Sequence, residues 1–186
     1  MLNKMFNLPA EREKNFICGL SMGGYGAMLL GLSQPEKYAG IGCFSGAVDP
    51  AMMINAMGGD SPAVRYIFEP VFGPELKVPE NRCLYSLAEK VAALPAEQQP
   101  KILLAAGRQD EEIYGVQSQN KALRAHLEKL SLADYRYMEW DGIHEWKFWD
   151  RCLVYAIDYF LGNGYAKSKL FDWRTPATVN GVPEEA

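Results

Sequence analysis

The sequence predicts an α/β fold, in which a mostly parallel sheet carries helices on both faces. Short apolar runs suited to buried strands alternate along the chain with longer segments of helical apolar spacing, which is typical of βαβ units. At 186 residues the chain has the length of a single domain. Its hydrophobic residues, 48% of the total, are enough to bury a sizeable core. These observations exclude a globally disordered chain.

Four strands and the helices between them are predicted in order along the chain. Residues 1–8 are expected to form the end of a helix that Pro9 stops. The predicted strands are the apolar or alternating runs Asn15–Cys18, Tyr38–Phe44, Lys101–Ala106 and Tyr135–Trp140. The predicted helices cover Gly19 to about Gln34, Tyr85–Leu94, Ile113–Leu130 and Glu145–Leu161.

Two segments depart from this alternation. Residues 51–84 are interrupted by glycines and prolines and are predicted to form an excursion above the sheet, with a short helix that Ser61 caps and Pro62 begins. Residues 165–186 lose the periodicity, and we expect a mobile tail in which Phe171 and Trp173 could dock. The predicted organisation is one domain over residues 1–164, followed by this tail.

Charge and hydropathy exclude several classes of partner. Lys and Arg total 19 against 23 Asp and Glu, so the net charge is −4, and no basic cluster offers a nucleic-acid surface. No apolar stretch approaches the roughly 18 residues of a membrane span, and the start of the chain lacks the pattern of a signal peptide. A cytoplasmic location is the prediction that follows by default.

The cysteines predict neither a metal centre nor a redox centre. No C-x-x-C pair and no histidine at ligand spacing accompanies them. We interpret all four as reduced and mostly buried thiols: Cys18, Cys43, Cys83 and Cys152. No cofactor is predicted.

The most informative motif is Gly19-Leu20-Ser21-Met22-Gly23, a G-x-S-x-G between a predicted strand and a predicted helix. In this setting a tight turn holds the serine hydroxyl clear of the sheet, so Ser21 is the candidate nucleophile. Side chains at Gly19 and Gly23 are expected to collide at the turn. Three further small residues are expected to let the helix approach the strand: Gly24, Gly26 and Ala27. The alternative is a glycine-rich turn without a catalytic role.

A serine nucleophile needs a base, and the sequence contains only two histidines. His144 lies in a predicted loop after the last strand, at the sheet edge where α/β folds bind their ligands. His126 lies in a charged amphipathic helix, where a solvated surface histidine is expected. We therefore predict His144 as the base, with an exposed or helix-capping histidine as the alternative.

The acid that orients this base is expected between the serine and the histidine in chain order, just past a strand end. Asp110 fits, because it follows the strand Lys101–Ala106 by a few residues. The alternative for Asp110 is a turn or N-cap residue, with Glu111 and Glu112 as fallback acids. Three other aspartates are poorly placed, after an earlier strand, in the excursion or beside His144: Asp49, Asp60 and Asp141.

Together these motifs resemble a known family. The segments are 19–27 around the serine, Ser45-Gly46-Ala47, Gly107 with Asp110, and residues 142–150 around the histidine. They are similar to the esterase D / tributyrin esterase group of α/β-hydrolases, which includes S-formylglutathione hydrolases, feruloyl and acetyl esterases and antigen 85-like mycolyltransferases. The resemblance covers about Met5 to Leu161. It implies a Ser21–Asp110–His144 triad, with the Met22 backbone N–H as one oxyanion donor.

The resemblance also implies a departure at the N-terminal side. Members of the family carry further strands before the serine, and a loop there supplies the second oxyanion donor. We expect those strands to be absent here, which would leave an open apolar edge at Asn15–Gly19. Two expectations follow: a homodimer or other self-association through that edge, and weak catalysis.

The predicted function is that of a serine carboxylic-ester hydrolase, which acts on small acyl esters, or thioesters, through an acyl-enzyme. One alternative is a catalytically impaired α/β-hydrolase fragment that serves as an assembly or binding module. Another is an acyltransferase with the same triad. Apolar residues of the excursion could line an acyl pocket or form the excursion's own core: Met52, Met53, Met57, Tyr66, Phe68 and Phe72.

Overall fold

The computed structural model describes Met5, residues 9–112 and 114–162, Gly164, and the backbone of residues 178–179 and 182–183. The strands are β1 (Phe16–Leu20), β2 (Gly40–Phe44), β3 (Lys101–Gly107), β4 (Tyr135–Trp140), β5 (Thr178–Val179) and β6 (Val182–Pro183). The helices are α2 (Met22–Ser33), α3 (Pro50–Ala56), α4 (Pro62–Phe72), α5 (Leu84–Ala92), α6 (Val116–Leu127) and α7 (Trp146–Leu161). Short 3-10 turns lie at Arg12–Lys14, Glu80–Arg82 and Ala96–Gln98.

The strands lie side by side in chain order, from β1 to β6. Strands β1 to β4 are parallel, whereas β5 pairs antiparallel with β4 and β6 antiparallel with β5. Because parallel strands end at the same edge of a sheet, the loops after β1, β3 and β4 are close together. This edge carries the candidate site.

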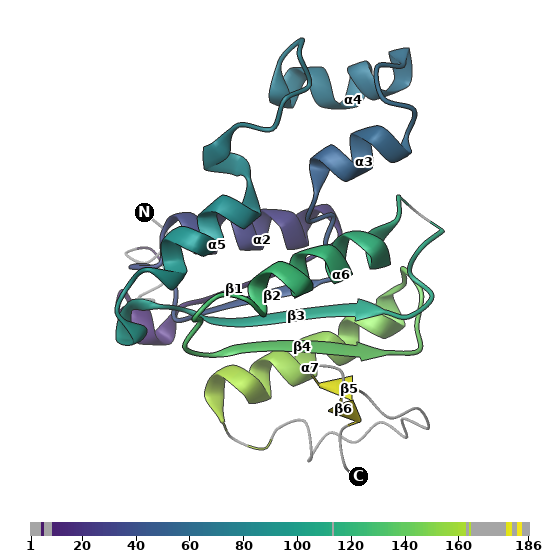
Figure 1. Ribbon diagram of the computed structural model, residues 1–186. Coiled ribbons are helices and arrows are strands. Elements are labelled where there is room, and N and C mark those ends of the chain that lie inside the picture. Colours follow the sequence, from purple (N-terminus) through teal and green to yellow (C-terminus); the bar gives the residue numbers. More distant parts are fainter. Residues whose placement is uncertain are drawn as a thin grey trace.

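Helices cover both faces of the sheet, which confirms the predicted fold class (Figure 1). Alternate residues of each strand point to opposite faces. Thus Ile102 and Leu104 of β3 pack in a cluster with α2, α5 and α6, while Leu103 and Ala105 pack in a second cluster with α7. Both clusters consist of fully or nearly fully buried side chains, so the four parallel strands form the rigid base of the site.

The predicted excursion stands above the sheet as α3 and α4 (Figure 1). Ser61 caps α4 and Pro62 begins it, as expected. Helix α3 was not predicted, because Asp49-Pro50 reads as a turn; in the structure Asp49 Oδ1 accepts the Met52 N–H at 2.9 Å and caps the helix. The two helices enclose a small core of their own, made of Ile54, Val64 and Phe68 with neighbouring apolar residues.

Several boundaries differ from the predicted ones. Strand β1 extends to Leu20, and its edge away from β2 pairs with no strand among the described residues. All four cysteines are free, but only Cys43 and Cys152 are buried, while Cys83 is half-buried and Cys18 is exposed. The predictions for residues 1–8 and for Phe171 and Trp173 fall outside the described residues, apart from Met5.

Two further predictions concern the tail and a possible membrane span. Only the backbones of Thr178–Val179 and Val182–Pro183 are described within the predicted tail, and they extend the sheet next to β4. Over the described part of the chain, every helix is too short or too polar to cross a membrane.

Candidate active site

Ser21 occupies the tight turn between β1 and α2. Its backbone has φ 54° and ψ −124°, a conformation that side-chain-bearing residues rarely adopt. Hydrogen bonds from both sides hold it there: Ser21 N–H donates to Phe44 O at 2.9 Å, and Ala47 N–H donates to Ser21 O at 3.1 Å. The strained turn is therefore supported by the end of β2 and the loop that follows it.

Only some of the glycines around Ser21 lie where a side chain would collide with its neighbours. A Cβ on Gly19 would lie 2.0 Å from Gly23 O, and a Cβ on Gly24 would lie 2.9 Å from Gly46 Cα. A Cβ on Gly23 or Gly26 would meet nothing within 4 Å. The predicted need for small residues is therefore correct for Gly19 and Gly24 and wrong for Gly23 and Gly26. What crowds the turn is the backbone carbonyl of Gly23, which faces Gly19.

The structure brings Ser21, His144 and Asp110 into one hydrogen-bonded line. His144 Nε2 lies 2.9 Å from Ser21 Oγ, and His144 Nδ1 lies 3.0 and 3.1 Å from the two carboxylate oxygens of Asp110. The three residues follow β1, β4 and β3 respectively. In this geometry His144 can accept a proton from the serine hydroxyl while the carboxylate orients the ring.

Burial differs along this line. Asp110 is 2% exposed, whereas the His144 side chain retains 14% exposure. The ring of Trp149 meets the His144 ring edge-on at a centroid distance of 4.9 Å, and Trp146 packs in the same manner against Trp149 at 5.4 Å. The aromatic side chains of α7 therefore hold the imidazole from one side.

Two glycines allow close packing beside Asp110 and His144: Gly107 lets the loop of Asp110 approach that of His144, and Gly142 makes room for the ring of Phe148. A Cβ on Gly107 would lie 2.2 Å from Gly142 O, and a Cβ on Gly142 would lie 2.4 Å from Phe148 Cδ2. The motifs included both residues, but their spacing alone did not predict this contact. The available signal is that each glycine lies within three residues of a candidate catalytic side chain and near a strand end.

The other acids weighed as candidates have different partners. Glu111 accepts hydrogen bonds from Ser118 N–H and Oγ at 2.9 and 2.6 Å. Asp49 caps α3 and accepts from the Tyr85 hydroxyl at 3.0 Å. Asp60 forms an ion pair with Arg65, and Asp141 accepts from Arg108 at 2.9 Å. Asp110 is the acid that faces His144.

His126 lies away from this arrangement but is not the solvated residue that we predicted. Its side chain is 26% exposed and its Nε2 lies 3.3 Å from Glu89 Oε1. Its ring packs edge-on against Tyr85 at 5.1 Å. The correction has a simple cause: α5 packs against α6 and covers this part of the helix.

Buried amides of α6 support the site and were missed in the sequence. Asn120 Nδ2 donates to Gly46 O at 2.8 Å, and Gln119 Oε1 accepts from Asp49 N–H at 2.9 Å. Both side chains are almost fully buried. Polar residues on the inner face of a helix contradict the usual amphipathic pattern, and that conflict is the signal that could have identified them.

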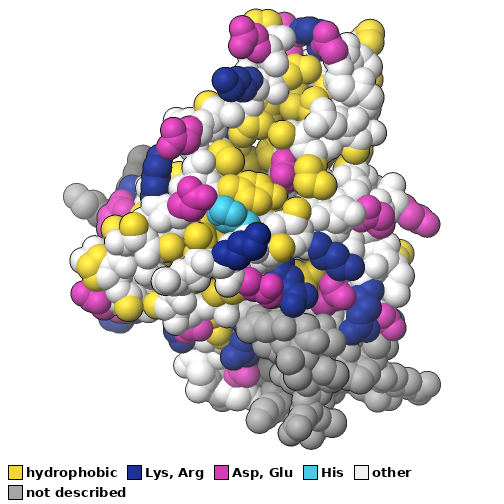
Figure 2. Space-filling model, viewed as in Figure 1, with side chains coloured by type: hydrophobic (Ala, Val, Ile, Leu, Met, Phe, Trp, Pro, Cys, Tyr) yellow, Lys and Arg dark blue, Asp and Glu magenta, His cyan; other side chains and the backbone are white. Residues whose placement is uncertain are grey.

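Exposed apolar side chains lie within two residues of Ser21 and His144 in the sequence. Met22 is 79% exposed, Trp146 is 69% exposed and Ile143 is 52% exposed. Figure 2 also shows hydrophobic side chains gathered where the α3–α4 segment overhangs the rest of the molecule. Among the described residues, no group of three or more His, Cys, Asp or Glu side chains could hold a metal ion.

Comparison with known proteins places the chain in a family. Residues 2–160 match the family model described as "Putative esterase". The chain belongs to this esterase family. Family membership and the solved structures below confirm the resemblance to esterase D-like α/β-hydrolases that the sequence motifs suggested.

Three similar proteins align with this chain over part of their own length. An acetyl esterase of Caldicellulosiruptor saccharolyticus is 32% identical over 162 residues, which cover 83% of this chain and 57% of the relative. FphF of Staphylococcus aureus, a fluorophosphonate-binding serine hydrolase, is 26% identical with a TM-score of 0.68, covering 86% of this chain and 59% of its own.

S-formylglutathione hydrolase (FrmB) of the same organism has 24% identity and a TM-score of 0.63, and covers 86% and 56% of the two chains. The similarity to FrmB concerns the fold alone. The chain therefore spans a little over half the length of these relatives.

Proposed function

We propose that this chain hydrolyses small carboxylic esters with Ser21 as the nucleophile, His144 as the base and Asp110 as the orienting acid. The observation that carries the proposal is the 2.9 Å contact between Ser21 Oγ and His144 Nε2, since a serine hydroxyl is a weak nucleophile without a base in reach. Asp110, on the other ring nitrogen, stabilises the imidazolium that forms.

The reaction would proceed through an acyl-enzyme. Ser21 Oγ attacks the ester carbonyl while its proton moves to His144 Nε2, and His144 then protonates the departing alcohol. Water, activated by the same imidazole, hydrolyses the acyl-serine and regenerates the hydroxyl. Membership of an esterase family supports this reaction class.

The Met22 backbone N–H is our proposed oxyanion donor. Met22 begins α2, and an N–H at a helix N-terminus carries a partial positive charge that favours a developing anion. It is the donor that we assign among the described residues. Because a second donor is worth about 10² to 10³ in kcat, a chain that acts with the Met22 donor alone should turn over activated aryl esters and should act far more slowly on alkyl esters.

Acetyl esters are the substrates to test first. The relative from Caldicellulosiruptor saccharolyticus is named an acetyl esterase, and the exposed apolar side chains of Met22, Ile143 and Trp146 favour an uncharged substrate. Thioesters are a second substrate class with the same acyl chemistry. The predicted cytoplasmic location stays a prediction.

Hydrolysis of an aryl acetate by the purified chain tests the proposal, with Ser21→Ala as the control. Wild-type turnover and labelling of Ser21 by a fluorophosphonate probe are expected, and both should vanish in the variant. Absence of both from the wild-type chain would instead favour the binding-module alternative. Activity that survives in Ser21→Ala would show that another residue is the nucleophile.

We also propose that a second copy of the chain covers the free edge of β1. This strand pairs only with β2 among the described residues. Unpaired N–H and C=O groups on a strand edge are a template for another strand. A symmetric dimer would pair the same edge of both copies.

A further inference from the structure

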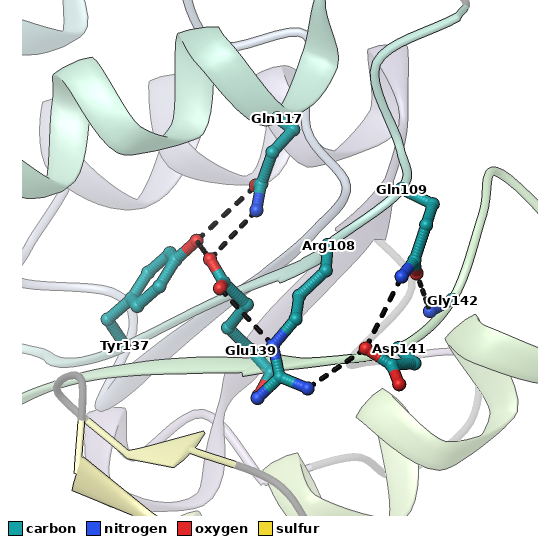
Figure 3. Close-up of polar contacts among 7 residues, drawn as sticks. All are labelled: Arg108, Gln109, Gln117, Tyr137, Glu139, Asp141 and Gly142. Atoms are coloured by element: carbon teal, nitrogen blue, oxygen red, sulfur yellow. Dashed lines mark hydrogen bonds and ion pairs between the residues drawn. The ribbon is translucent and has the colours of Figure 1, made fainter. Parts of the chain in front are cut away.

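A polar network joins the loop of Asp110 to the loop of His144 (Figure 3). Gln109 is its central residue and directly precedes Asp110. Its backbone N–H donates to Gly142 O at 3.2 Å, while its side-chain Oε1 accepts the Gly142 N–H at 2.8 Å. The two residues thus form a closed pair of hydrogen bonds, as if the ladder between β3 and β4 continued beyond its last pair.

The other end of the Gln109 amide contacts Asp141. Gln109 Nε2 donates to Asp141 Oδ1 at 3.3 Å, and Arg108 Nη1 donates to the same oxygen at 2.9 Å. The hydrogen bond from Arg108, followed by that from Gln109, lowers the pKa of Asp141, so this carboxylate stays an acceptor. Gln109 therefore binds two consecutive residues of the histidine loop, Asp141 through its side chain and Gly142 through its backbone.

A second branch of the network leads through Glu139 and Gln117 to the backbone of Asp110. Arg108 forms an ion pair with Glu139 at 3.5 Å, and Glu139 accepts from Gln117 Nε2 at 2.8 Å. The backbone N–H of Gln117 donates to Asp110 O at 2.7 Å. Tyr137 also donates to Glu139 at 2.9 Å; burial, then the charge of Glu139, raises the pKa of this tyrosine and keeps the donor protonated.

We propose that Gln109 is a positioning residue that sets the contact between Asp110 and His144. The proposal rests on the proposed function. Asp110 and His144 come from different strands and meet only through their loops, and Gln109 connects those loops one residue before the acid and two before the histidine. A displacement of about 1 Å can cost on the order of 10²-fold in rate, so a connection at this point controls the catalytic geometry.

The matched control is Gln99, a second glutamine whose amide joins two loops. Gln99 Nε2 donates to Leu94 O at 2.9 Å, and Gln99 Oε1 accepts the Ala133 N–H at 2.8 Å. It precedes β3, so it lies at the opposite end of the strand from the candidate site. Gln99→Ala removes a half-buried amide that joins two loops, and Gln109→Ala removes an exposed one. Of the two amides, only that of Gln109 borders the candidate site.

The experiment compares both variants with wild type in two measurements. One is the NMR signal of the His144 Nδ1 proton, which a hydrogen bond to the Asp110 carboxylate moves far downfield of the amide region. The other is the rate of fluorophosphonate labelling, with kcat and KM for an aryl acetate. Gln109→Ala is expected to lose or broaden the proton signal and to lower labelling and kcat about tenfold with little change in KM. Gln99→Ala should leave all of these unchanged.

A swap of donor and acceptor tests the Gln109–Asp141 contact itself. Gln109→Glu alone places two carboxylates face to face and should resemble Gln109→Ala. Gln109→Glu combined with Asp141→Asn restores one donor and one acceptor at unchanged net charge, and should recover the signal and most of the rate. Failure of the double variant to recover either would overturn the role of this contact.

The two proposals can fail separately. Equal behaviour of Gln109→Ala and Gln99→Ala in both measurements would overturn the positioning role, whatever the activity. A wild-type chain that shows the downfield proton but neither labelling nor turnover would overturn the esterase proposal, and the NMR comparison would still decide the inference.

Discussion

At the scale of single residues, the two histidines provide the sharpest test of the site. His144→Ala should abolish fluorophosphonate labelling and lower kcat by about 10⁴-fold or more, because Ser21 loses its base. His126→Ala should leave labelling intact, since its ring packs on Tyr85 of α5. Loss of labelling in a stably folded His126→Ala variant would reverse the assignment of the base.

The glycines of the turn give a second prediction at this scale. Gly19→Ala would place a Cβ 2.0 Å from Gly23 O, so it should lower the free energy of unfolding by several kcal/mol, about the upper range of single substitutions. Gly26→Ala has open space within α2 and should raise it by about 0.5–1 kcal/mol, because alanine favours the helix. Urea denaturation measures both changes. Equal destabilisation by the two variants would contradict the crowding that we describe at Gly19.

At the scale of elements, the α3–α4 segment depends on its caps and its own small core. Asp49 binds both the Met52 N–H and the Tyr85 hydroxyl, and so joins α3 to α5. Asp49→Ala should lower the stability of the segment by about 1 kcal/mol or more and accelerate amide hydrogen exchange in α3. Exchange in β3, which lies in the main core, should not change.

Asp60→Ala is the control for this prediction. Asp60 is a largely exposed partner of Arg65, and exposed ion pairs stabilise little. Hydrogen exchange in α3 that is equally fast in both variants would mean that the cap and the Tyr85 contact are not what holds the segment.

At the scale of the whole molecule, the edge of β1 that no described strand covers predicts the oligomeric state. Light scattering should give twice the chain mass of 20.8 kDa. Cys18 is an exposed residue of β1, and lysine on an edge strand disfavours pairing with another strand. Cys18→Lys should therefore shift the population toward the monomer. A wild-type monomer at all concentrations would contradict the dimer.

Much of this protein could be read from local sequence patterns. Burial of short apolar runs and of one helix face is a local requirement, so all four parallel strands and most helices were predicted within a few residues. Tight turns also carry local signatures, which is why Ser21 and its turn were identified. Chain order and strand ends then favoured Asp110 as the candidate acid, with Glu111 and Glu112 as fallbacks, and His144 as the candidate base. Helix α3 was not predicted because Asp49-Pro50 indicates a turn as readily as a helix start, and the contact between Asp49 and Tyr85 that supports the helix joins residues 36 positions apart.

The tertiary structure decided what no local pattern carries. It placed Ser21, His144 and Asp110 within hydrogen-bond reach across 123 and 34 positions of sequence. It also showed that a side chain at Gly23 would have space, while Gly107 is confined by the backbone of Gly142 and Gly142 by the ring of Phe148 in α7. The hydrogen bonds from Gln109 to Gly142 and Asp141 are likewise features that only the tertiary structure shows. Such contacts depend on which strands become neighbours and how closely their loops pack, and the sheet as a whole determines both.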